Sequence, residues 1–314
     1  MYIGSKVEAV YVEETQVIMK SRKPVKPVVE KLDNRLNIYQ ATRWKKLITY
    51  PELIAYSVLI SFLGKKFDIV VPVMAKTFYG ESMKVILPET VSTTIYRYGF
   101  YELGLTKFIL NYLKPGMIFF DVGSHFGYFS LLASHLLQTE GEVHLFEPTR
   151  STFKIAAENT GARKNVILNN LAVWSCNTTI PFNDFGVQNC AFNSVRSTAR
   201  YIKPTTAVSY DIEAISLDSY VETKGIKPDF IKIDAESAEY EILKGMQRIL
   251  SEIKPILTVE VGDLGVEDAV PSRELIDYIL AQGYQVFEFS DGRIQTHEPR
   301  NSYDYDNLLF IPEI

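Results

Sequence analysis

The chain of 314 residues changes character at about residue 95, after which short apolar runs alternate with segments of helical periodicity. The predicted strands cover residues 117–121, 143–147, 165–168, 230–234, 256–261, 284–289 and 308–311. The predicted helices cover residues 128–137, 149–159, 238–250 and 273–282. Buried strands that alternate with helices predict a doubly wound, mostly parallel α/β sheet, here of seven strands. Ligands of such sheets bind at the carboxyl ends of the strands.

Residues 1–94 lack this alternation and form a predicted N-terminal α+β appendage, while residues 95–314 form the main domain. The basic, proline-containing stretch 20–27 is typical of an exposed linker. The stretch 53–63 carries apolar residues on nearly every face of a helix, which predicts that it is buried. A hairpin is predicted from β-rich runs at 67–72 and 83–88.

Composition narrows the class of protein. With 46% hydrophobic and 23% charged residues the chain has the make-up of a globular protein. Its net charge of −5 argues against a protein that grips nucleic acid through a broad basic surface. Only Cys176 and Cys190 occur, which favours a reducing, cytoplasmic location. Residues 1–16 lack the apolar run of a secretory signal, and no apolar stretch reaches the roughly 20 residues of a membrane-spanning helix.

The strongest local motif runs from Asp121 to Gly127, directly after a predicted strand and at the start of a helix. Gly123 and Gly127 permit a tight turn and a close approach of backbone to ligand, and Ser124 and His125 lie within that turn. The spacing differs from the Gly-x-Gly-x-x-Gly of dinucleotide sites, and no phosphate-binding P-loop occurs. Asp121 suits a ligand with a cationic portion, such as an ammonium group. An ordinary turn between strand and helix is the simpler alternative.

Glu147 strengthens the functional interpretation. It ends the second predicted strand, 24 residues after Gly123, where an acidic side chain can accept hydrogen bonds from both hydroxyls of a ribose. A solvated surface glutamate is the alternative for this residue alone. The order of glycine turn and then acid is more specific than either piece, and it indicates a ligand that contains a nucleoside.

A third group of residues surrounds the strand 230–234. Lys232 in an otherwise apolar strand is costly to bury unless it is paired, so we expect it to meet a carboxylate. A structural ion pair of Lys232 with Glu236 or Glu239 is one interpretation. Asp234 lies at the carboxyl end of the strand, which faces the ligand crevice, and Glu260 has the same placement on the next strand.

These motifs together resemble those of the FkbM-type methyltransferases, over roughly residues 95–290 and in unbroken order. The residues that carry the resemblance are Tyr98–Glu102, Lys114–Gly116, Asp121–Gly127, Glu147 and Pro148, Asn170–Val173, Lys232–Glu236, Glu239 and Leu243–Gly245. The resemblance implies a class I, Rossmann-like methyltransferase fold that uses S-adenosylmethionine. It also implies methyl transfer to a hydroxyl of a sugar, a glycan or a small metabolite.

The same resemblance implies roles for individual residues. Asp121, Gly123 and Gly127 would line the methionine and ribose part of the cofactor, Glu147 would hold the ribose, and the turn from Asn170 to Ala172 would flank the adenine. The full set predicted to bind the cofactor is Glu102, Asp121, Gly123, Ser124, His125, Gly127, Glu147, Asn170 and Ala172. Asp234, Glu236 and Glu239 would border the transfer site. The chain departs from the family pattern at His125, where asparagine is common, and at Ser237, where glycine is common.

Methyl transfer from a sulfonium is an in-line displacement, and positioning of the acceptor oxygen can supply about 7–11 kcal/mol of the barrier. The candidates for the base that takes the acceptor's proton are Asp234 and Glu236, then Glu260, with His125 behind them. No His or Cys cluster has the spacing of zinc ligands, so no metal is predicted. A magnesium ion held by Asp234 and neighbouring acids is a less favoured alternative.

Other functions fit the sequence less well. Methyltransferases of base amino groups use Asp/Asn-Pro-Pro-Tyr/Phe where this chain has Asp234-Ala-Glu-Ser. Cytosine C5 chemistry needs a nucleophilic cysteine after proline, whereas Ser175 precedes Cys176 and Asn189 precedes Cys190. A catalytically silent binding module with the same fold is the main alternative. A dehydrogenase is disfavoured by the missing Gly-x-Gly-x-x-Gly.

The appendage has two interpretations. Trp44, Lys45 and Lys46, with the apolar stretch 53–63, could cover the acceptor site or touch a membrane surface that carries a lipid-linked acceptor. Simple packing of the appendage on the α/β domain is the interpretation that the sequence favours. The predicted partner is a small-molecule or glycan acceptor, without nucleic acid, and the oligomeric state is left open.

Overall fold

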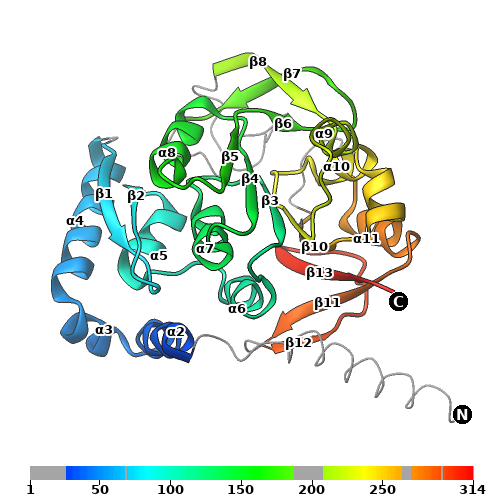
Figure 1. Ribbon diagram of the computed structural model, residues 1–314. Coiled ribbons are helices and arrows are strands. Elements are labelled where there is room, and N and C mark those ends of the chain that lie inside the picture. Colours follow the sequence, from blue (N-terminus) through cyan, green and yellow to red (C-terminus); the bar gives the residue numbers. More distant parts are fainter. Residues whose placement is uncertain (1–25, 68, 187–207, 264–269, 291–292, 314) are drawn as a thin grey trace, which may run out of the picture.

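The computed structural model describes residues 26–67, 69–186, 208–263, 270–290 and 293–313 (Figure 1). The predicted linker up to residue 25, residues 1–16 and Cys190 lie outside the described residues. A large sheet runs through the middle of the molecule, with helices on both sides of it (Figure 1).

The large sheet has eight strands in the order β12-β11-β13-β10-β9-β3-β4-β5. Their bounds are β3 (Ile118–Val122), β4 (Glu142–Phe146), β5 (Val166–Asn169), β9 (Phe230–Ile233), β10 (Ile256–Val261), β11 (Tyr284–Ser290), β12 (Arg293–Thr296) and β13 (Asp306–Pro312). The five strands from β10 to β5 are parallel to one another, while β13 pairs antiparallel with both β10 and β11, and β12 pairs antiparallel with β11. The predicted mostly parallel α/β sheet is therefore confirmed.

The predicted count of seven strands in that sheet is wrong by one. The extra strand, β12, forms a hairpin with β11 at the edge of the sheet and pairs with no other strand. It consists of Arg293, Ile294, Gln295 and Thr296, none of which is buried. A short, polar edge strand lacks the apolar run by which the inner strands are recognised.

Helices cover both faces of the sheet because the strand side chains alternate in direction. Phe119 joins one hydrophobic cluster with residues of α6 (Leu103–Tyr112), α7 (Tyr128–Leu137) and α8 (Arg150–Thr160). Its neighbour Phe120 joins the cluster on the opposite face, with α9 (Leu217–Lys224), α10 (Glu239–Lys244) and α11 (Ser272–Leu280). The helix predicted over 238–250 ends at Lys244, and a π-helical turn follows at Ile249–Ile253.

A second, three-stranded sheet was not foreseen in the sequence. It consists of β6 (Ala172–Val173), β8 (Val208–Ile215) and β7 (Thr178–Asp184), in that order. Its strands bury alternate positions and leave the others at the surface, so few apolar residues mark them in the sequence. This sheet matters for function because it carries Ala172 and Phe182 to the main cavity described below.

The N-terminal part contains α2 (Lys26–Tyr39), α3 (Arg43–Thr49), α4 (Pro51–Phe67), the strands β1 (Val71–Lys76) and β2 (Ser82–Leu87), and α5 (Thr90–Tyr98). The predicted hairpin is confirmed, although its first strand begins at Val71. The predicted boundary at 94/95 falls inside α5. Leu32 and Met83 share a hydrophobic cluster with Phe119, so both sides of that boundary contribute to one core. The division into two domains stays a prediction.

Helix α4 lies at the edge of the molecule and packs on β2 and α5 (Figure 1). The expectation that the stretch 53–63 is buried is wrong for most of it. Ser57, Ile60 and Gly64 are buried on one side, whereas Phe62 on the other side is 61% exposed. Among the described residues no single helix could cross a membrane by length and apolarity. The pair of α3 and α4 as far as Gly64, bent by 111°, meets that test together.

Candidate functional site

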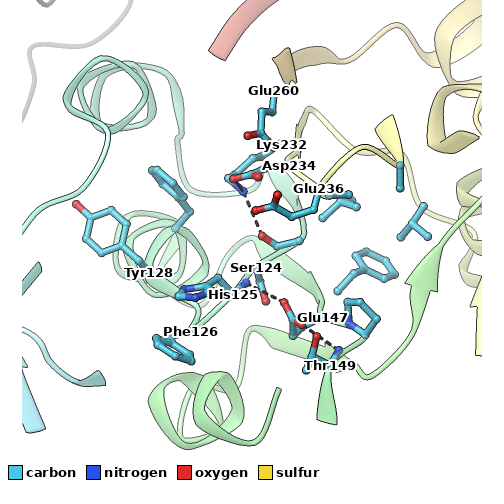
Figure 2. Close-up of a pocket in the computed structure, with 18 of the residues that line it drawn as sticks. Ser124, His125, Phe126, Tyr128, Glu147, Thr149, Lys232, Asp234, Glu236 and Glu260 are labelled. Atoms are coloured by element: carbon cyan, nitrogen blue, oxygen red, sulfur yellow. Dashed lines mark hydrogen bonds and ion pairs between the residues drawn. The ribbon is translucent and has the colours of Figure 1, made fainter. Parts of the chain in front are cut away.

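A cavity of about 310 Å³ opens at the carboxyl ends of the parallel strands (Figure 2). Its walls come from the turn after β3, the segment after β4, the segment after β9 and the end of β10. Eight of the predicted site residues line it: Gly123, Ser124, His125, Glu147, Ala172, Asp234, Glu236 and Glu260. The sheet topology explains this convergence, because parallel strands place their carboxyl ends along one edge.

The turn after β3 can contain only glycine at Gly123. Its φ is +73°, and an added Cβ would lie 1.6 Å from the backbone oxygen of Asp234. The backbone N–H groups of Gly123 and Ser124 donate to the carbonyl of Phe146. The turn is therefore held between the ends of β4 and β9. Gly127, with a φ of +82°, begins helix α7.

Glu147 is tied to the same turn. Its Oε2 accepts from the backbone N–H of His125 at 3.0 Å, and its Oε1 accepts from that of Thr149 at 3.0 Å (Figure 2). Burial raises the pKa of Glu147 to about 7. Each oxygen of an ionised carboxylate has two lone pairs, so Glu147 retains acceptor capacity toward hydroxyl groups in the cavity.

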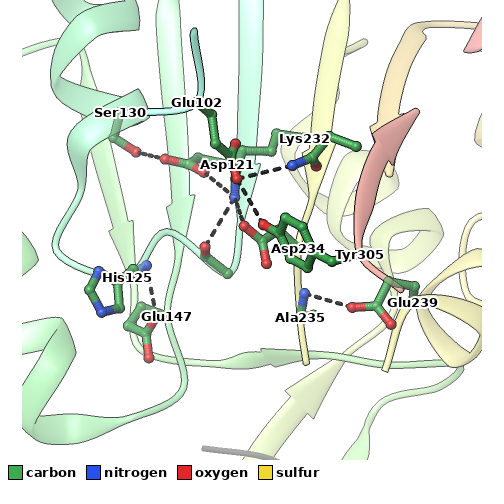
Figure 3. A network of polar contacts seen from close by, with 12 residues as sticks. Glu102, Asp121, His125, Ser130, Glu147, Lys232, Asp234, Ala235, Glu239 and Tyr305 are labelled. Atoms are coloured by element: carbon green, nitrogen blue, oxygen red, sulfur yellow. Dashed lines mark hydrogen bonds and ion pairs between the residues drawn. The ribbon is translucent and has the colours of Figure 1, made fainter. Parts of the chain in front are cut away.

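Lys232 is the centre of a buried ion-pair network (Figure 3). Its Nζ lies 3.0 Å from Oδ2 of Asp234, 3.7 Å from Oδ1 of Asp121 and 3.3 Å from the carbonyl oxygen of Gly123. Burial alone would lower the pKa of Lys232, but the two carboxylates outweigh it and raise that pKa. The expectation that Lys232 is paired is confirmed, with Asp234 and Asp121 as partners rather than Glu236 or Glu239.

Three acidic side chains face the cavity near Lys232. Burial would raise the pKa of Asp234, but Lys232 and a hydrogen bond with Glu260 lower it below its usual value. Burial first, and then the charge of Asp234, raise the pKa of Glu260 and of Glu236 well above the usual value. Near neutral pH the arrangement therefore keeps Asp234 ionised while Glu236 and Glu260 hold protons.

Four predicted cofactor residues are not among the residues that line the cavity: Glu102, Asp121, Gly127 and Asn170. Asp121 is fully buried and accepts from the Ser130 hydroxyl at 2.6 Å. The side-chain amide of Asn170 donates to the backbone oxygen of Glu147 at 2.8 Å. These two residues hold the wall in place. No comparison tests their proposed contact with a cofactor, which stays a prediction.

Glu102 and Glu239 also support the wall from behind. The Glu102 carboxylate accepts from the Tyr305 hydroxyl at 2.9 Å and from the Asn307 amide at 3.0 Å. Burial raises its pKa to about 7. Glu239 accepts from the backbone N–H of Ala235 at 2.8 Å and so fixes the segment between Asp234 and α10 (Figure 3).

Several aromatic residues on the wall were missed in the sequence, namely Tyr101, Tyr128, Phe182 and Tyr305. Tyr305 shows why. It precedes β13, which runs antiparallel to β10 with Asp306 opposite Val261. The start of β13 therefore meets the carboxyl end of β10, where Glu260 lies. Only the order and direction of the strands bring Tyr305 to the cavity, and no local motif marks it.

The His125 side chain lies against Phe126, with ring centroids 4.0 Å apart, and its backbone has a φ of +52°. Burial lowers the pKa of His125, which favours the neutral imidazole. Among the described residues no group of three or more His, Cys, Asp or Glu side chains is arranged to hold a metal ion.

Comparison with known proteins identifies the family to which this chain belongs. The family model of the methyltransferase FkbM domain matches residues 121–286, from the glycine turn to β11 and over more than half of the chain. The chain belongs to the FkbM methyltransferase family. The resemblance seen in the sequence motifs is confirmed by this match.

Individual relatives are more distant. The hexuronic acid methyltransferase AglP of Haloferax volcanii is 29% identical over 158 residues, which are 50% of this chain and 61% of that protein. The chain thus spans about three fifths of the length of this curated relative. Similar solved structures include a methyltransferase FkbM from Methylobacillus flagellatus KT, with 18% identity and a TM-score of 0.39 over 62% of this chain and 43% of that one. Another is a precorrin-6y C5,15-methyltransferase from Geobacter metallireducens GS-15, with 13% identity and a TM-score of 0.37 over 66% and 84%.

Proposed function

We propose that this FkbM-family protein transfers a methyl group from S-adenosylmethionine to a hydroxyl of a sugar or glycan. The observation that carries the proposal is the contact between the glycine turn and Glu147 at the ends of adjacent strands, in a cavity that Asp234 also lines. The family match over residues 121–286 supports the same reaction class.

The residues present fit such a donor. Ser124 places a buried hydroxyl at the cavity that has no hydrogen-bond partner among the described residues, which suits a polar group of a ligand. Gly123 leaves the backbone bare, and Glu147 can accept from ribose hydroxyls. The ionised carboxylate of Asp234 suits the positive charge of a sulfonium or an ammonium group. Ala172 and Phe182 supply an apolar wall for a purine.

The donor supplies an electrophilic methyl group when it is bound, and the protein's own task is to orient the acceptor oxygen and to receive its proton. Asp234 is our first candidate for the proton acceptor. Lys232 and Glu260 keep it ionised near neutral pH, so a lone pair is available. Glu236 and Glu260, the other two candidates from the sequence, have raised pKa values and hold their own protons in the same range, so they are less suited to accept one.

The residues that line the cavity also indicate which charge the acceptor carries. The relative's name indicates a hexuronic acid as that protein's acceptor. In the part of the chain that the structure describes, Lys232 is the one Lys or Arg on the cavity wall, and two carboxylates already neutralise it. We therefore propose a neutral sugar hydroxyl as the first acceptor class to test, with hexuronic acids as the second.

A methyl-release assay with labelled donor and a panel of neutral glycosides, glycans and hexuronic acids tests the proposal. Asp234→Asn should lower kcat by about 10²–10⁴-fold at saturating donor. Donor affinity is measured separately, because the loss of this charge also weakens attraction for the donor's positive sulfur. Tight donor binding without transfer to any acceptor would favour a silent binding module instead. Equal kcat for the wild type and Asp234→Asn would remove Asp234 from its proposed role.

A further inference from the structure

Helices α3 and α4 present a concentration of apolar side chains to solvent. We call the residues Trp44, Leu47, Ile48, Val58, Leu59 and Phe62 the α3–α4 surface. Among the residues that the structure describes, twelve of the fourteen exposed large hydrophobic ones lie between residues 39 and 74, and Trp44 and Ile48 are 76% and 78% exposed. Scattered exposed apolar residues are common in monomeric proteins, but clusters of them mark interaction sites.

One side of helix α4 packs against the rest of the protein, so only the opposite side can contact another molecule. The Ser57 hydroxyl accepts from Nε of Arg97 at 2.7 Å, and Ile60 is buried. At Gly64 an added Cβ would lie 2.7 Å from Pro88, which shows how closely the helix approaches the strand end. Val58, Leu59 and Phe62 remain more than half exposed and are not covered by any residue that the structure describes.

The charge around the α3–α4 surface is opposite to that of the whole chain. Residues 43–67 contain five Lys or Arg and one Glu, a net charge of +4, in a chain with a net charge of −5. The basic residues lie at both ends of this segment: Arg43, Lys45 and Lys46 surround Trp44, and Lys65 and Lys66 follow Phe62. Two copies of the chain that met through this surface would bring like charges together.

We propose that the α3–α4 surface docks on an anionic lipid bilayer. Apolar side chains flanked by Lys and Arg are the composition of elements that lie in the membrane interface, with the cations near the lipid phosphates. Trp44 is an aromatic residue of the kind enriched at that depth. Helix α5 packs on α4 and contributes Val91 and Ile95 to the cavity, so docking holds the cavity one helix away from the lipid.

The experiment is flotation of the full chain with vesicles of phosphatidylcholine alone or mixed with phosphatidylglycerol. We expect the protein to float with the mixed vesicles and to be released by salt, because the cationic part of the attraction is screened. Trp44 and Trp174 are the two tryptophans of the chain. In a Trp174→Phe background the emission of Trp44 should shift to the blue and be quenched by brominated lipid.

Two variants give the matched comparison. Trp44→Ser with Phe62→Ser should weaken vesicle binding by at least about tenfold, since two large apolar groups are lost. Val208→Ser changes an exposed apolar residue far from α3 and α4, with 65% exposure, and should bind vesicles like the wild type. Affinity for S-adenosylhomocysteine, measured in each variant, reports that the fold is intact and does not depend on docking.

Three results would overturn the proposal. The first is absence of flotation with the mixed vesicles at low salt. The second is equal flotation of the double variant and the wild type. The third is a dimer in sedimentation that dissociates in the double variant, which would make the α3–α4 surface a contact between copies.

Discussion

Gly123 is the position that least tolerates any other residue. A Cβ there would collide with the backbone oxygen of Asp234, and the positive φ adds strain for any other residue. Gly116 provides the contrast, because it has a φ of +91° but open space around the position of its Cβ. The two glycines therefore separate the effect of backbone strain from the effect of close approach.

We predict that Gly116→Ala lowers the free energy of unfolding by about 1–2 kcal/mol without changing donor affinity. Gly123→Ala should lower it further and should also reduce donor affinity, because the turn must move away from Asp234. Chemical denaturation and calorimetric titration measure the two quantities. Donor affinity of Gly123→Ala equal to that of Gly116→Ala would show that the close approach does not shape the donor site.

Glu147 gives a pH-dependent prediction with a definite sign. Its pKa is raised to about 7 in the folded protein by burial, above the ordinary value of 4.5. The folded state therefore holds a proton that the unfolded chain has lost between these values. This contribution to stability is complete below about pH 4.5 and disappears as the pH rises through 7.

Replacing Glu147 with glutamine removes this titration. Between pH 4.5 and 8 the wild type should lose up to about 3 kcal/mol of unfolding free energy relative to Glu147→Gln. Denaturation curves of both proteins at several pH values measure the difference. If the two stability profiles run parallel across this range, Glu147 is not the buried, raised group described here.

At the residue scale the sequence already predicts where the acids lie, because each follows an apolar strand in a parallel sheet. It does not predict which of them pair. Asp121 and Lys232 face each other in the register of β3 and β9, strands that are separated by more than 100 residues. Tyr305 reaches the cavity through the direction of β13. Such contacts depend on strand order, which short motifs do not encode.

Among the strands and helices, too, the sequence predicts some elements and not others. The inner strands β3, β4, β9 and β10 are mostly apolar and almost entirely buried, and so they stand out in the sequence. Strands β7, β8 and β12 are partly exposed and contain polar residues, and they were missed. For helix α4 the error was the opposite: its apolar composition predicted burial, but its outer face is exposed. Apolar composition alone does not tell whether a partner covers a face.

The pairing of β3 with β9 yields a prediction on stability. Lys232→Met would leave Asp121, which is fully buried, without its cation. We expect a loss of about 3–5 kcal/mol of unfolding free energy. The double variant Asp121→Asn with Lys232→Met should recover part of that loss, because the fully buried charge of Asp121 is removed and only Asp234 is left without its cation. A loss below about 1 kcal/mol in the single variant would show that the pair is solvated rather than buried.

The whole molecule combines two regions of opposite charge. The cavity is lined by four acidic side chains, Glu147, Asp234, Glu236 and Glu260, of which Asp234 is ionised near neutral pH and suits a cationic ligand. The α3–α4 surface is basic and apolar, and it suits anionic lipid. The net charge of −5 conceals this separation, because it averages over both regions. The two proposals are independent, since vesicle binding and donor binding use different residues.

The most direct test of the central claim is a calorimetric titration of S-adenosylmethionine and S-adenosylhomocysteine into the protein at about pH 8 and about pH 6. The two ligands differ in the positive charge on sulfur, and protonation of Glu147 and its neighbours weakens the attraction for that charge. We predict that both bind, and that the affinity for S-adenosylmethionine falls about fivefold more than that for S-adenosylhomocysteine at the lower pH. Failure of S-adenosylmethionine to bind, or an equal pH dependence of the two ligands, would contradict the account.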